Sequence, residues 1–259
     1  MKRAIVMFLL LSMLGSLMSF NANASESSYS WYCKRMQDNK QPPLPTEFGF
    51  IEKYPCIWID KSESKKVYLT FDAGYENGNV EKILDILEWK NVKGAFFILL
   101  NLINSNPDLV KRMSDDGHLV CNHTAHHKNM SKITDARAFK KELDILSDAY
   151  YSLTGDRLAS YYRPPEGSFS ESNLKNAQAL GLKTVFWSFA YVDWDNSAQP
   201  SVEFSKKKIL DNVHDGAVIL LHPTSATNAA ILGEVIDEIR AMGYEFGTLD
   251  EIVCQSYIG

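Results

Sequence analysis

Cysteine is scarce in this chain, and none of its four cysteines lies in a Cys-x-x-Cys spacing. This absence argues against a zinc site built from thiolates. Basic residues are also in the minority, with 27 Lys and Arg against 32 Asp and Glu and a formal net charge of −5. Such an acidic balance gives no support to binding of nucleic acid or anionic lipid. Internal repeats and low-complexity tracts are absent as well, so nothing in the sequence indicates a repeat protein.

The first 24 residues have the features of a secretory signal peptide. Lys2 and Arg3 give a positive start, residues 4–20 are apolar and uncharged, and residues 22–24 (Ala-Asn-Ala) fit the rule for cleavage before Ser25. Without Lys2 and Arg3 the net charge becomes −7. An uncleaved membrane anchor is the alternative, although the apolar stretch is short for a spanning helix. In both cases the folded part is expected outside the cytoplasmic membrane, and after cleavage no stable membrane span is expected.

Residues 25–64 are expected to form an N-terminal extension that wraps around the main body. The proline-rich run at 41–45 is unsuited to a helix or a strand. Five aromatic residues are expected to anchor the extension: Trp31, Phe48, Phe50, Tyr54 and Trp58.

Export would permit oxidation of the cysteines. Cys33 and Cys56 flank one N-terminal segment and are the candidate pair, with no pairing established by the sequence. Cys121 lies in a predicted buried strand, so we expect it to be a plain core thiol.

From residue 65 to the C-terminus, predicted strands and helices alternate. Periodicity and composition predict strands at 67–71, 94–100, 118–122, 160–162, 183–188, 217–221 and 244–247. They predict helices at 80–90, 107–116, 135–154, 170–180, 204–213 and 226–242, with a final short helix after the last strand. This alternation predicts an α/β fold of about seven parallel strands, as a barrel or sheet with helices outside.

The residues suited to chemistry all follow predicted strands. In β/α folds the active site forms at the carboxyl ends of the strands. We therefore expect one cluster of Asp72, His123, His127, Arg163, Asp193, Trp194 and His222.

Residues 123–127 read His-Thr-Ala-His-His. Two histidines four residues apart on a strand-end loop can turn both rings toward one ion, which makes His123 and His127 candidate metal ligands. A structural or solvent-facing role is the alternative. His126 is expected to point away. A helical zinc-protease motif is disfavoured, because Thr124 stands where that motif needs Glu.

Asp72 and Arg163 form the second predicted unit. Asp72 is a candidate general base, or else a strand-terminal residue that caps a turn. The two prolines that follow Arg163 stiffen its loop, so Arg163 is expected to pair with Asp72 and keep it ionised, the alternative being a solvated surface arginine. Tyr75 is expected to shape the pocket, and the backbone N–H of Glu166 to bind a developing oxyanion.

His222 is the natural general acid for a leaving amine within this set. Asp193 is expected to hydrogen-bond a catalytic histidine. Trp194 is expected to stack on that ring or on the face of a sugar, while the aromatic run before it is also compatible with a plain core.

Five segments together resemble the polysaccharide deacetylase (NodB-homology) family, carbohydrate esterase family four. They read Thr-Phe-Asp-Ala at 70–73, His-Thr-Ala-His-His at 123–127, Arg-Pro-Pro-Glu-Gly at 163–167, Asp-Trp at 193–194 and Leu-Leu-His at 220–222. The resemblance covers residues 65–259 and implies a distorted (β/α) barrel as the catalytic domain. It implies Asp72 as base, Arg163 orienting it, Asp193 supporting His222, and His222 as acid, with His123 and His127 holding a divalent metal, zinc by expectation. Pro165 and Glu166, with Tyr75 and Trp194, are the expected substrate contacts.

Within this family the chain resembles the delta-lactam-biosynthetic de-N-acetylases, through residues 68–78, 111–115, 184–188 and 192–194. This implies hydrolysis of the acetamide of N-acetylmuramic acid in peptidoglycan without stem peptides, in the cell-wall or spore-cortex space, leading to muramic δ-lactam. Deacetylation of N-acetylglucosamine polymers and a non-catalytic glycan-binding relative are the alternatives.

Two positions depart from the family pattern. Ala73 stands where the family carries a second Asp, a metal ligand, and Ala190 stands where many members carry another Asp. Two histidines alone are expected to form a weaker metal site than two histidines and an aspartate.

Overall fold

The computed structural model describes residues 27–36, 38–62 and 64–253. The signal-peptide prediction for residues 1–24 therefore falls outside the described residues. Among the helices that are described, none combines the length and apolar character that a membrane crossing requires.

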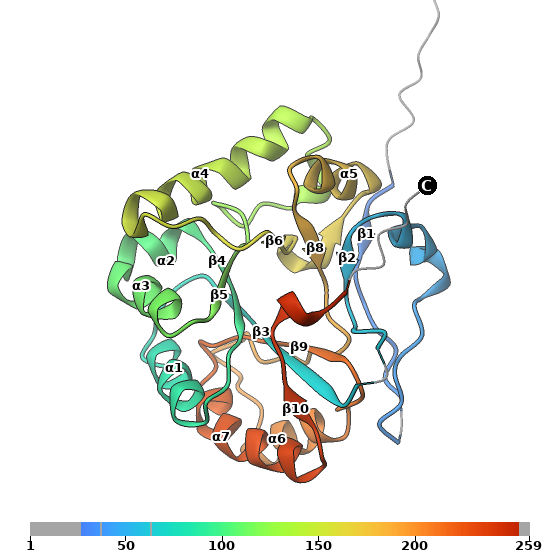
Figure 1. Ribbon diagram of the computed structural model, residues 1–259, viewed down its shortest axis with the longest axis vertical. Helices are drawn as coiled ribbons and strands as arrows, with labels where there is room; N and C mark the ends of the chain where they lie inside the picture. Colours follow the sequence, from blue (N-terminus) through green and yellow to red (C-terminus); the bar gives the residue numbers. More distant parts are fainter. Residues whose placement is uncertain (1–26, 37, 63, 254–259) are drawn as a thin grey trace, which may run out of the picture.

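A curved parallel sheet lies at the centre of the described part of the chain (Figure 1). Its eight strands are β2 (Cys56–Ile57), β3 (Lys66–Ala73), β4 (Ala95–Ile98), β5 (Leu119–Asn122), β6 (Tyr161–Tyr162), β8 (Lys183–Val185), β9 (Ala217–Leu221) and β10 (Glu245–Phe246). The hydrogen-bonded order is β10-β3-β4-β5-β6-β8-β2, and β9 pairs with β3. An isolated parallel bridge between Phe189 and Ile219 connects β9 to the segment after β8. The predicted α/β barrel-like fold is confirmed, and all seven expected strands are present.

Helices surround this sheet in Figure 1. They are α1 (Val80–Trp89), α2 (Leu100–Ser105), α3 (Pro107–Asp115), α4 (Ala136–Thr154), α5 (Glu171–Ala179), α6 (Val202–Leu210) and α7 (Ala226–Ala241). The six predicted helices all occur, and α4 ends at Gly155, whose φ of 80° is the left-handed conformation that favours glycine. The short helix α2 was not expected, because residues 94–100 read as one apolar strand that in fact stops at Ile98.

The two faces of β3 have different neighbours. Val67, Leu69 and Phe71 belong to a large cluster shared with residues of α1 and α7, whereas Tyr68 packs in a separate cluster with Phe97. Because side chains alternate along a strand, Thr70 and Asp72 share the face of Tyr68. The strand therefore buries an apolar row against the helices and carries its polar residues on the opposite face.

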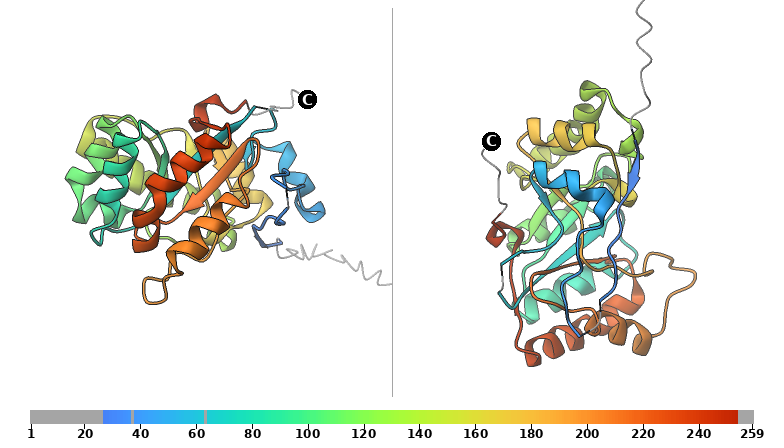
Figure 2. Two further views of the ribbon diagram at one scale, coloured as in Figure 1. Left: turned by 90° about the horizontal axis from the view of Figure 1, so that it is seen from below. Right: turned by 90° about the vertical axis from the view of Figure 1, so that its right-hand side faces the viewer.

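The N-terminal segment packs beside β8, as the blue part of Figures 1 and 2 shows. Its strand β1 (Tyr29–Ser30) pairs antiparallel with β7 (Ser168–Phe169). The Trp31 ring stacks on Phe186 at 4.4 Å, and its Nε1 donates to the Trp187 carbonyl at 2.8 Å. Residues 56–57 form β2 and pair with β8, so part of this segment belongs to the sheet itself.

The cysteines of the described chain are thiols, and no disulfide joins Cys33 to Cys56 there. The Cys33 thiol instead donates to the Trp187 carbonyl at 3.0 Å. Cys121 is buried in β5, as expected. Cys254 lies outside the described residues.

Candidate active site

Arg163 is the buried centre of the site. Its side chain has no exposed surface and uses all three of its nitrogens. Nη1 donates to Asp72 Oδ1 at 2.7 Å, Nη2 to Thr70 Oγ1 at 2.8 Å and to the Phe186 carbonyl at 3.2 Å, and Nε to the Val185 carbonyl at 3.1 Å. The predicted contact with Asp72 is present, and the alternative of a solvated surface arginine is wrong.

Asp72 is placed by β3 and held by this guanidinium. Burial works to raise the pKa of its carboxyl, but electrostatic interactions with His123, Arg163 and His222 and the Arg163 hydrogen bond bring it below its usual value. Arg163 binds Oδ1, which leaves Oδ2 on the side of His123 Nε2. Asp72 is therefore an ionised carboxylate at neutral pH.

His123 is buried directly beside Asp72. Its Nδ1 lies 2.9 Å from the Arg163 carbonyl, to which only a protonated nitrogen can donate. The unprotonated nitrogen is then Nε2, which lies 3.5 Å from Asp72 Oδ2. Burial lowers the pKa of His123 to about 4, so the ring is neutral at neutral pH. A backbone partner on one ring nitrogen is also how metal-binding histidines are oriented.

The loop that carries both histidines has an unusual backbone. Thr124 and His127 have φ values of 75° and 53°, in the left-handed region that β-branched residues in particular avoid. The backbone N–H of Thr124 donates to Asn122 Oδ1 at 2.8 Å, and that of His127 donates to Thr124 Oγ1 at 3.0 Å. Such strain persists where the surroundings enforce it, and it is common at functional sites.

His127 and His126 face different neighbours. The His127 ring meets the His123 ring edge-on, with 5.1 Å between centroids. His126 is half exposed, and its Nδ1 lies 3.0 Å from Glu142 of α4. Thus His126 points away from the site, as the sequence indicated.

The donor set for a metal is small. Within residues 27–36, 38–62 and 64–253, no three or more His, Cys, Asp or Glu residues form a group that could hold a metal ion. Ala73, where the family has an aspartate, is fully buried in the apolar cluster of Phe71. His123 and His127 therefore offer two imidazoles, one fewer protein ligand than a typical catalytic zinc site.

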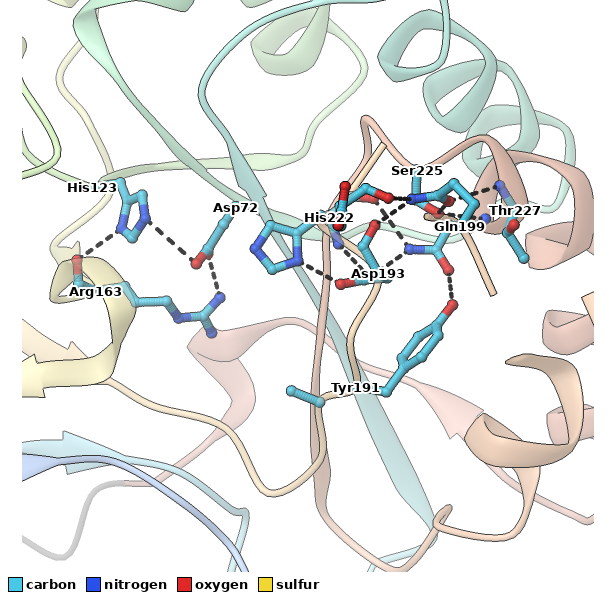
Figure 3. A network of polar contacts seen from close by, with 12 residues as sticks. Asp72, His123, Arg163, Tyr191, Asp193, Gln199, His222, Ser225 and Thr227 are labelled. Atoms are coloured by element: carbon cyan, nitrogen blue, oxygen red, sulfur yellow. Dashed lines mark hydrogen bonds and ion pairs between the residues drawn. The ribbon is translucent and has the colours of Figure 1, made fainter. Parts of the chain in front are cut away.

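His222 follows β9 and is held by Asp193. Its Nδ1 lies 2.7 Å from Asp193 Oδ1, and its backbone N–H donates to Oδ2 at 2.8 Å. Burial works to lower the pKa of His222, but the hydrogen bond and charge of Asp193, with the charge of Asp72, raise it above its ordinary value. In Figure 3 the His222 ring lies between Asp72 and Asp193. The predicted Asp193–His222 contact is present.

The four expected substrate contacts differ in exposure. Trp194 and the His222 ring meet at 5.9 Å with a steep interplanar angle of 62°, so they are not stacked, and Trp194 is 55% exposed. Tyr75 is 45% exposed, and its hydroxyl accepts from Asn196 Nδ2 at 2.6 Å. Pro165 is buried, whereas Glu166 is exposed and has a left-handed φ of 59°. The orange loop that leads into α6 and carries Trp194 projects from the body in Figure 2.

Four polar residues at the site were not predicted to have a role there. Thr70 receives a hydrogen bond from Arg163, and Gln199, Tyr191 and Asn228 connect Asp193 to α7. None of them stands at a strand end beside a histidine or carboxylate, the pattern that identified the others. The motif Thr-Phe-Asp does contain Thr70, but its hydroxyl had no predicted partner.

The sheet and this cluster define a hydrolase of the carbohydrate-esterase type, and the sequence comparisons agree. The family model for polysaccharide deacetylase matches residues 60–185. The chain belongs to the polysaccharide deacetylase family, carbohydrate esterase family four, and is a hydrolase that acts on amide bonds.

Two relatives are similar over most of the chain. Peptidoglycan-N-acetylmuramic acid deacetylase PdaA of Bacillus subtilis is 38% identical over 225 residues, which is 86% of this chain and 85% of the relative. The structure of that protein superposes with a TM-score of 0.83 and 37% identity, over 87% of this chain and 96% of the other. A peptidoglycan-N-acetylglucosamine deacetylase of Bacillus cereus is 31% identical over 208 residues, covering 79% of this chain and 74% of the relative.

Proposed function

We propose that this protein removes the acetyl group from N-acetylmuramic acid in peptidoglycan that lacks stem peptides, a step toward the muramic δ-lactam of spore cortex. The observation that carries the proposal is that one site holds both a base and an acid. Asp72 is kept ionised by Arg163, and Asp193 raises the pKa of His222. A base and an acid with opposed pKa tuning are what amide hydrolysis needs. The similarity to PdaA supports the muramic substrate. We place the reaction outside the cytoplasmic membrane.

The chain's own residues account for the proton transfers. Asp72 takes a proton from water, whose oxygen attacks the acetyl carbon. His222 is an imidazolium in this step: its Nδ1–H donates to Asp193, and its Nε2 gives a proton to the nitrogen as the carbon–nitrogen bond breaks. The backbone N–H of Glu166 is proposed to bind the oxyanion, Arg163 to keep Asp72 aimed, and Tyr75 and Trp194 to contact the sugar. The products are acetate and a free amino sugar.

The two-histidine loop is proposed to hold a divalent metal, with zinc as first candidate. Bound there, the ion would supply Lewis-acid polarisation of a carbonyl. We expect His127→Ala to weaken zinc binding at least about tenfold, since it removes one of two ligands. His126→Ala is the matched control, because that neighbouring histidine faces Glu142 and should leave the affinity unchanged. Titration calorimetry on the two variants makes the comparison, and equal zinc affinities would assign the metal elsewhere.

The alkaline limb of the rate profile is expected to report His222. A general acid works only while protonated, so activity should fall as the pH rises through its raised pKa. Asp193→Asn removes the charge that raises this pKa, and the limb should therefore move to lower pH. Initial rates of acetate release across a pH series, at saturating glycan, measure the shift. A limb that stays in place in the variant contradicts the assignment of His222 as acid.

A direct test uses acetate release from peptidoglycan pre-treated with an amidase, with the protein stripped of metal and then resupplied with zinc. Mass analysis of the resulting muropeptides locates the lost acetyl group. Loss at muramic acid is the expected result. Loss at glucosamine would favour the second candidate function, which the similarity to the Bacillus cereus relative supports. Glycan binding without any release would favour a binding protein and make Ala73 the reason.

A further inference from the structure

Asn228 is a buried amide behind the proposed general acid. It is the third residue of α7, is 1% exposed, and its backbone N–H donates to Ser225 Oγ, the cap of that helix, at 3.1 Å. The side chain therefore comes from a rigid helical turn rather than from a loop. Burying an amide without partners is costly, so the identity of its partners indicates what it does.

The partners of this amide surround the Asp193–His222 pair. Nδ2 donates to Asp193 Oδ2 at 2.7 Å and to the His222 carbonyl at 3.1 Å, while Oδ1 accepts from the Tyr191 hydroxyl. The opposite orientation of the amide would turn its oxygen toward two acceptors. The Tyr191 hydroxyl and these two acceptors thus select one orientation, in which Nδ2 faces the carboxylate.

We propose that Asn228 is a positioning residue that fixes the rotation of the Asp193 carboxylate and thereby keeps His222 in its proton-donating form. Oδ2 receives the Asn228 amide and the His222 backbone N–H, which leaves Oδ1 for the His222 ring alone. Gln199 supports the same unit, since its Nε2 donates to the Asp193 carbonyl and its Oε1 accepts from Ser225 Oγ. The proposal rests on the proposed role of His222 as acid.

Charged groups near His222 come from three elements. Asp72 is on β3, Arg163 follows β6 and Asp193 follows β8, while α7 contributes the neutral Asn228. A change at Asn228 therefore adds or removes no charge. A shift in the titration of His222 would then reflect how Asp193 is held and hydrogen-bonded rather than a change of net charge.

Asn228→Leu keeps the branched shape and the number of side-chain heavy atoms and removes the hydrogen bonds. We expect the pKa of His222, followed by NMR of histidine-labelled protein without metal, to fall by at least about half a unit, since half a unit already means a threefold change in equilibrium. Turnover on amidase-treated peptidoglycan should fall about tenfold with little change in KM, and its alkaline limb should move to lower pH. Tyr191→Phe removes only the hydrogen bond from the Tyr191 hydroxyl to Asn228 Oδ1. It should shift the pKa of His222 and the alkaline limb in the same direction, but by less.

Asn173→Leu is the matched control, because Asn173 is equally buried and hydrogen-bonded but lies in α5. It should lower thermal stability without moving the His222 titration. An Asn228→Leu protein that loses stability like this control, with an unchanged His222 pKa, overturns the proposal. The NMR result does not depend on activity. If the natural protein releases no acetate but Asn228→Leu still lowers the pKa of His222, the proposed function is refuted and the positioning role of Asn228 stands.

Discussion

Replacing Asp72 by Asn is expected to slow acetate release by about 10²–10⁴-fold, the range that a positioned general base contributes. Asn keeps an oxygen that can accept from Arg163 Nη1 but has no lone pair basic enough to take a proton from water. Binding of the glycan should persist, because Asp72 is nine-tenths buried and offers little surface to a sugar. The loss should therefore appear in kcat rather than in KM.

The measurement is the rate of acetate release from amidase-treated peptidoglycan by the purified protein in the presence of zinc. Asp237→Asn is the control, since it makes the same chemical change at an exposed residue that pairs with Lys90 on the helical surface. Circular dichroism and a thermal melt establish that the Asp72 variant is folded. Undiminished release by folded Asp72→Asn would rule out Asp72 as base and transfer that role to another group.

Much of this site could be predicted because β/α alternation brings distant strand ends to one edge. Asp72 lies near the end of β3, while His123, Arg163 and His222 follow β5, β6 and β9, and parallel pairing places those strand ends together. The Asp72–Arg163 and Asp193–His222 contacts could be inferred too, because a buried arginine or histidine needs a partner and a neighbouring carboxylate is the natural one. The fold could be predicted as well, because residues 65–259 show the hydrophobic spacing of alternating strands and helices.

The supporting layer was beyond such reasoning. Asn228 and Gln199 are ordinary polar residues in a helix and a loop, and their partners are determined by how α7 packs against the loop after β8. β2 has only two paired residues, too short for an alternating pattern, and depends on β8 being beside it. Features created by tertiary packing leave no local period in the sequence.

Removing Arg163 is expected to have the largest effect on stability. Arg163→Met leaves the Asp72 carboxylate buried without its ion pair, and losing one partner of a buried pair destabilises a protein by about 3–5 kcal/mol. Urea unfolding at neutral pH, followed by tryptophan fluorescence, measures this loss. The hydroxyl of Thr70 and two carbonyls would also lose a donor, which adds to the effect.

The stability difference between the natural protein and this variant should shrink as the pH falls. In the natural protein the pKa of Asp72 is lowered from 3.8, so its contribution is present above that value and is lost as the pH falls through the folded pKa. Without Arg163, one lowering charge and its hydrogen bond are gone, so the pKa of Asp72 should lie higher than in the natural protein, and protonating Asp72 should cost the variant less stability as the pH falls. Arg163→Met should therefore lose less stability than the natural protein on acidification.

The double variant Asp72→Asn with Arg163→Met separates a buried charge from lost packing. If the unpaired carboxylate causes the loss, neutralising it should make the double variant more stable than Arg163→Met alone. A double variant no more stable than Arg163→Met would mean that the guanidinium acts mainly through its bonds to Thr70 and the β8 carbonyls. In that case Arg163 would hold the sheet together rather than hold the proposed base in its ionised form.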